Sequence, residues 1–101
     1  MEEYENDLRA LQAARQRFAE GQEAGQDPAD LKKELDDELL PIVRKVDDDI
    51  RRYLNQLDEI TDIDPERVTQ ERVNAWVHLE IAVRFREGIW GLRQSILQEG
   101  R

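Results

Sequence analysis

Residues 28–60 repeat their apolar side chains every eleven positions, and this repeat constrains the fold more than any other feature of the chain. Successive apolar residues are spaced 4, 4, 3, 4, 4, 3 and 4 apart, which places one stripe along a helix with about 3.67 residues per turn. The stripe consists of Leu31, Leu35, Leu39, Ile42, Val46, Ile50, Tyr53 and Leu57. The repeat therefore predicts a long amphipathic helix over 28–60 that buries one face.

Proline and aspartate mark where two of the helices begin. Asp27 is placed to cap a helix whose first residue is Pro28, and Asp64 and Pro65 repeat the arrangement. Pro41 lies inside the eleven-residue pattern, where it removes one backbone hydrogen bond. Because the apolar period continues through Pro41 without a change of phase, we expect a kink there rather than a split into two helices.

Two further helices are predicted, over residues 2–20 and 65–98. The stripe of the first is formed by Tyr4, Leu8, Leu11 and Phe18. Arg15 fills the missing stripe position, so the seam is expected to be weaker there. The helix over 65–98 is apolar around well over half of its circumference, which is typical of a helix surrounded by others. We therefore expect it to be the central helix, with Trp90 packed in the core.

The chain as a whole is expected to be all-α and to form a single domain over residues 1–101. Apolar alternation of period two, the signature of strands, is absent over any useful length. The short connection at 61–63 makes the two long helices antiparallel neighbours. The predicted protomer is a short first helix with a long antiparallel hairpin.

The lengths of these helices do not match. A helix of about 19 residues can cover only part of a hairpin whose arms are each about 50 Å long. The uncovered end is predicted to expose an apolar patch of Ile50, Tyr53, Leu57, Val73, Trp76 and Val77. A patch of this kind usually marks a binding surface. The simplest cover is a second copy, which would give a twofold homodimeric helical bundle.

Composition excludes several classes of function. With 24 acidic and 15 basic residues the chain has a formal charge of −9, so direct binding to nucleic acid is disfavoured by repulsion. The chain contains no cysteine and one histidine, and no nucleophile–base set can be assembled from its motifs. No apolar run is long enough for a membrane span and the N-terminus is acidic. We expect a cytoplasmic protein that is not an enzyme, with no cofactor and no membrane partner.

The leading interpretation is a non-enzymatic interaction or assembly module that binds itself or another protein. Two alternatives stay open. The acidic stripe that includes Asp47 and Asp48 is compatible with an inhibitor that imitates nucleic acid, of the kind phages and mobile elements encode, although interleaved basic residues favour a solvated face. His78 is compatible with a carboxylate–histidine metal site between subunits, or with a pH switch, although a hydrogen-bonded, partly buried histidine is the simpler expectation.

Overall fold

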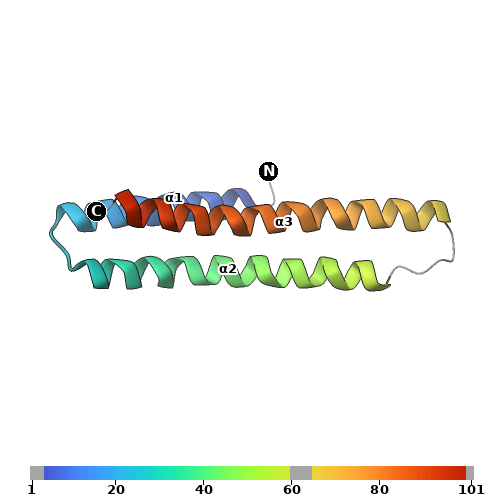
Figure 1. The fold of residues 1–101 in the computed structure, drawn as a ribbon, viewed down its shortest axis with the longest axis horizontal. Helices are drawn as coiled ribbons and strands as arrows, with labels where there is room; N and C mark the ends of the chain where they lie inside the picture. Colours follow the sequence, from blue (N-terminus) through green and yellow to red (C-terminus); the bar gives the residue numbers. More distant parts are fainter. Residues whose placement is uncertain (1–3, 60–64, 100–101) are drawn as a thin grey trace. The chain divides into compact units, whose positions relative to one another are not determined.

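The computed structural model describes residues 4–59 and 65–99, with the side chains of 4–59 and 70–99. The chain forms three α-helices, α1 (Glu5–Glu23), α2 (Pro28–Glu59) and α3 (Pro65–Glu99), drawn in Figure 1. Strands are absent from the described residues, so the predicted all-α class is confirmed. Each helix begins and ends within three residues of its predicted bounds. The predicted connection at 61–63 and the cap at Asp64 lie outside the described residues.

The chain divides into two compact units, and both long helices contribute to each of them. Unit 1 comprises Met1–Val43 and Ile89–Arg101, which bring α1 together with the first part of α2 and the last part of α3. Unit 2 is Arg44–Gly88 and contains the remaining parts of α2 and α3. Within the described residues, unit 1 therefore packs three helical segments and unit 2 only two.

The turn between α1 and α2 closes one helix and starts the next. Gly25 adopts a positive φ of 77°, and the amide of Gln26 donates to the carbonyl of Gly21 at 3.0 Å. With the Gly25 amide bonded to the Gln22 carbonyl at 3.1 Å, this is a Schellman ending, in which glycine avoids the steric cost of the left-handed conformation. Two residues later, the Asp27 carboxylate accepts a bond from the Ala29 amide at 2.9 Å, as the predicted cap requires.

The eleven-residue stripe of α2 is the main component of the core. Seven of its eight residues are buried, from Leu31 through Tyr53, and Leu57 is half-buried. Pro41 lies within α2, and the helix continues through it without a break, so the alternative of a split helix is wrong. A kink at Pro41 stays a prediction.

In α1 the buried face differs from the predicted stripe. The buried side chains are Leu11, Ala14 and Phe18, together with Tyr4 just before the helix, whereas Leu8 is exposed. Position 14 therefore completes the stripe, and Arg15 lies beside it with its guanidinium 2.5 Å from the Glu99 carboxylate of α3. Small Ala14 and Gly21 are buried against the other helices of unit 1, and an added Cβ at Gly21 would overlap the side chain of Leu31. Close packing of α1 on α2 follows from these small residues.

The core face of α3 is narrower than its composition predicts. Its buried residues are Ala75, Leu79, Ala82, Ile89 and Ile96, at spacings of 4, 3, 7 and 7. The expectation that α3 is surrounded is wrong within one chain, because Trp76 and Trp90 are 56% and 49% exposed. Two helical neighbours at most adjoin α3 in unit 1 and one in unit 2, and these cover one side of it rather than its whole circumference.

Candidate interaction surfaces

Unit 2 exposes four large apolar side chains on its two helices. These are Leu54 on α2 and Val73, Trp76 and Val77 on α3, each between 46% and 56% exposed. We call these four residues the hairpin surface. Three of them belong to the patch predicted from helix lengths, and Leu54 was not part of that prediction. Val73, Trp76 and Val77 share one face of α3 because they are three and four positions apart, and an exposed apolar face of this kind is typical of a contact site.

The other half of the predicted patch is covered within the chain. Ile50 and Tyr53 are buried, at 8% and 6% exposure, and Leu57 is half-buried. The expectation that these residues lack intramolecular cover is therefore wrong for Ile50 and Tyr53. The physical reason is that antiparallel helices cover each other's facing sides, so a two-helix unit needs no third helix to bury the α2 stripe. Whether any of the six predicted residues forms an interface stays a prediction.

The Tyr53 ring contacts both Arg52 of α2 and His78 of α3. Its hydroxyl accepts a bond from Arg52 Nη2 at 3.2 Å, and the Arg52 guanidinium carbon lies 5.0 Å from the ring centroid. The imidazole of His78 stacks on the same ring with centroids 5.3 Å apart and planes 16° apart. His78 is exposed, so the expectation that it is partly buried is wrong. Its observed contact is consistent with packing of α3 on α2.

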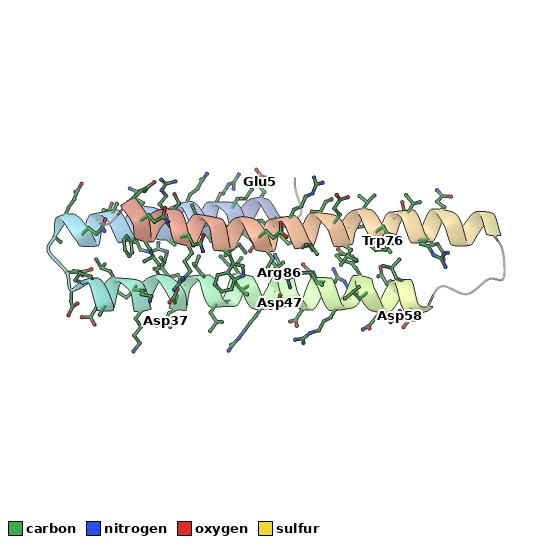
Figure 2. All side chains as sticks on the ribbon, viewed as in Figure 1. Glu5, Asp37, Asp47, Asp58, Trp76 and Arg86 are labelled. Atoms are coloured by element: carbon green, nitrogen blue, oxygen red, sulfur yellow. The ribbon has the colours of Figure 1, made fainter. Side chains whose placement is uncertain are left out.

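Several acidic residues of α2, including Asp47 and Asp48, form ion pairs with arginines. Arg86 Nη1 of α3 lies 3.3 Å from Asp47 Oδ1, and Figure 2 shows the two side chains directed toward each other. Asp48 lies 3.8 Å from Arg51 on the same helix, and both are exposed. These contacts neutralise part of the stripe that a nucleic acid mimic would present. Among the described residues, no three His, Asp or Glu side chains converge to form a metal site.

Unit 1 has a cleft between α2 and α3 with a volume of about 260 Å³. We call this the α2–α3 cleft, and it is lined by Asp36, Leu39, Leu40, Val43, Ile89, Trp90 and Arg93. Leu39 and Ile89 are buried, whereas Leu40 and Trp90 are 44% and 49% exposed. None of its lining residues comes from α1, so the third helix of unit 1 leaves this cleft open.

A two-bond ion pair joins the helices at the α2–α3 cleft. Arg93 Nε donates to Asp36 Oδ1 at 2.6 Å and Nη2 donates to Oδ2 at 3.2 Å. The hydrogen bond from Arg93 holds the pKa of the Asp36 carboxyl below its ordinary value, against a smaller opposing effect of burial. The same bond raises the pKa of Arg93. Both groups are therefore ionised at neutral pH, and their charges compensate each other at the cleft.

Sequence reasoning missed Leu40 and Trp90 as surface residues. Trp90 was expected in the core because it falls among the many apolar residues of α3, and Leu40 was outside the α2 stripe. The available signal for Leu40 is that a leucine lies off the eleven-residue period, fourteen positions before the similarly placed Leu54. For Trp90, apolar residues occur on so many sides of α3 that no pattern separates an exposed face from a buried one.

Two further findings bear on how the chain can be classified. The helices in the described part of the chain include none that is long and apolar enough to cross a membrane. Comparison with protein-family models, with curated proteins and with solved structures finds no match to this chain.

Proposed function

We propose that this protein is a non-enzymatic interaction module that acts by self-association into a homodimeric helical bundle. The observation that supports it is the hairpin surface of unit 2, where Leu54, Val73, Trp76 and Val77 are about half exposed. Such a surface would be covered by a second helical hairpin, and a twofold interface uses the same residues on both copies. Each apolar contact of the hairpin surface would therefore be made twice in the dimer, once by each copy.

Burial of the hairpin surface would contribute several kcal/mol to the free energy of association. A tryptophan that is half exposed retains on the order of 100 Å² of apolar surface, so its burial contributes about 2.5 kcal/mol before the costs of association. Two copies of Trp76 contribute twice this amount in a symmetric dimer. Large aromatic residues of this kind often dominate the affinity of an interface. Trp76 is accordingly the residue whose removal tests the proposal best.

The test is the mass of the chain in solution, measured by size-exclusion chromatography with light scattering over the micromolar range. The wild-type chain is expected to show the mass of a dimer, and Trp76→Ala is expected to shift the equilibrium toward a single chain by at least tenfold. Because Trp76 is exposed within the chain, helical content and melting of the dilute protein should change little.

A matched control is Leu8→Ala, which removes an exposed leucine from α1, outside the hairpin surface. This variant is expected to dimerise as the wild type does. A single-chain mass at every concentration would contradict self-association, and equal effects of the two variants would contradict the assignment of the hairpin surface.

A further inference from the structure

In unit 2, one side of α3 continues past the apolar residues of the hairpin surface into a charged segment. We call this side the outward face of α3, and it consists of Val73, Trp76, Val77, Glu80, Arg84, Glu87 and Gly88. Their spacings of 3, 1, 3, 4, 3 and 1 follow the turn of a helix, so these residues share one side of it. All of them are exposed, whereas the buried residues Ala75, Leu79 and Ala82 lie on the other side.

Two opposite charges occupy the middle of the outward face. Arg84 Nη2 lies 2.6 Å from Glu80 Oε1, and the two side chains are 76% and 59% exposed. An ion pair that is this exposed adds little to the stability of a single chain. In an interface the same two charges restrict how a partner can be oriented, because bringing like charges together is strongly unfavourable.

The order of the two charges makes the outward face complementary to itself in one orientation. If two copies of α3 pack antiparallel around a twofold axis at the level of Ala82, Glu80 of each copy lies opposite Arg84 of the other. If the two copies pack in parallel, Glu80 lies opposite Glu80 and Arg84 opposite Arg84. A second copy of the chain therefore supplies both complementary charges when it is antiparallel.

The same register brings large side chains to the level of a glycine. Trp76 and Val77 of one copy lie at the level of Glu87 and Gly88 of the other. Within the chain, nothing lies within 4 Å of a Cβ added at Gly88, so the space beside this position is open. A residue without a side chain lets a neighbouring molecule approach the helix backbone closely. The outward face therefore matches a second copy in size as well as in charge.

We propose that Glu80 and Arg84 determine the specificity of self-association, by setting two α3 helices antiparallel around Ala82. This rests on the proposed function, because it requires the chain to dimerise. It adds two charged residues that lie outside the hairpin surface, and it assigns an orientation and a register to the two copies. The apolar residues supply most of the affinity, whereas the charges disfavour the parallel arrangement.

The test reverses each charge alone and then mixes the two variants. Glu80→Lys places two cations opposite each other in the antiparallel dimer, and Arg84→Glu places two anions there. Each variant alone is expected to raise the dimer dissociation constant at least tenfold, measured by sedimentation equilibrium in low salt. In an equimolar mixture every pair again joins a cation to an anion. The mixture is therefore expected to show the mass of a dimer at concentrations where each variant alone is a single chain.

A matched control is the exposed ion pair of α1 between Glu5 and Arg9. It has the same spacing, with Arg9 Nη2 3.0 Å from Glu5 Oε1, and it lies in unit 1. Glu5→Lys and Arg9→Glu break an ion pair within one helix and change the net charge as the test variants do. Their dissociation constants are expected to stay close to that of the wild type, alone and mixed.

The outcomes separate this inference from the proposed function. If the wild-type chain dimerises but mixing Glu80→Lys with Arg84→Glu restores no dimer, the antiparallel register is wrong, while self-association stands. The same conclusion follows if Glu80→Lys tightens the dimer and Arg84→Glu loosens it, because net charge alone would then explain both. Equal effects of the control variants would also overturn the inference. If the wild-type chain has the mass of a single molecule at every concentration, both proposals are overturned.

Discussion

At the scale of single residues, the contact between Asp36 and Arg93 makes part of the stability of unit 1 depend on pH. The Arg93 hydrogen bond lowers the pKa of Asp36 in the folded chain. A carboxyl whose folded pKa is depressed stabilises the fold above its unfolded pKa of about 3.9, and this contribution is lost as pH falls through the lower folded value. Because the pair is partly exposed, solvent screening limits the size of the effect.

The corresponding prediction concerns Asp36→Asn. At pH 7 this variant is expected to unfold at a lower urea concentration than the wild type, and the difference should shrink as the pH is lowered below about 4. Asp37→Asn is the matched control, because Asp37 is exposed and adjacent in sequence. A difference for Asp36→Asn that stays constant down to the acid limit of the native state would show that the ion pair does not stabilise the fold.

At the scale of elements, the contact of α1 with α2 depends on the absence of a side chain at Gly21. An added Cβ would overlap the Cδ2 methyl of Leu31, which is buried, so this side chain would have to shift. Gly21→Ala is therefore expected to destabilise the chain by about 1–3 kcal/mol through overpacking, despite the better helix propensity of alanine. Chemical denaturation followed by circular dichroism measures this.

Gly91→Ala provides the comparison for Gly21. Gly91 also lies in a helix of unit 1, and nothing lies within 4 Å of an added Cβ there. This variant is expected to stabilise the chain by about 0.5–1 kcal/mol, because alanine loses less backbone entropy in a helix. If both variants shift the unfolding midpoint in the same direction, the close approach at Gly21 is not a determinant of packing.

The helices differ in how far their sequences predict them. In α2 most apolar residues lie on one face, so the period alone identifies the buried residues, and within the stripe only Leu57 deviates. In α3 apolar residues occur on nearly every side, and Arg86 and Arg93 occupy positions that continue the spacing of Leu79, Ala82 and Ile89. Their long side chains reach Asp47 and Asp36 across the helix pair. A pattern of polar and apolar residues cannot show that arginines occupy positions on the side of α3 that faces α2. The apolar residues of α3 therefore predicted a wider buried face, which wrongly included Trp90.

The sequence also predicted only part of the exposed apolar surface. Helix lengths correctly placed exposed residues at Val73, Trp76 and Val77, because no third helix belongs to unit 2 in the described part of the chain. They failed at Ile50 and Tyr53, because length says nothing about which side of α2 faces its antiparallel neighbour. Exposure at the cleft depends on which side α1 occupies in unit 1, and a sequence pattern does not specify this.

At the scale of the whole molecule, the charge of −9 opposes self-association. In the proposed dimer, apolar contacts must overcome repulsion between like charges, which salt screens over about 10 Å at 0.1 M and over about 3 Å at 1 M. The dimer dissociation constant is therefore expected to fall as sodium chloride is raised, which sedimentation equilibrium can measure. A dissociation constant that rises with salt would show that ion pairs, and not apolar contacts, hold the copies together.

In the part of the chain that the structure describes, unit 2 has two helical segments, which has a consequence for how this unit opens. Each segment has one neighbour, so transient local unfolding should cost less free energy there than in unit 1. Amide hydrogens of 44–59 and 70–88 are accordingly expected to exchange with deuterium faster than those of 31–43 in a dilute sample. If a second copy covers the hairpin surface, this exchange slows as protein concentration rises. Local unfolding of 44–59 and 70–88 would then be coupled to assembly, because only the locally folded form can bind a second copy.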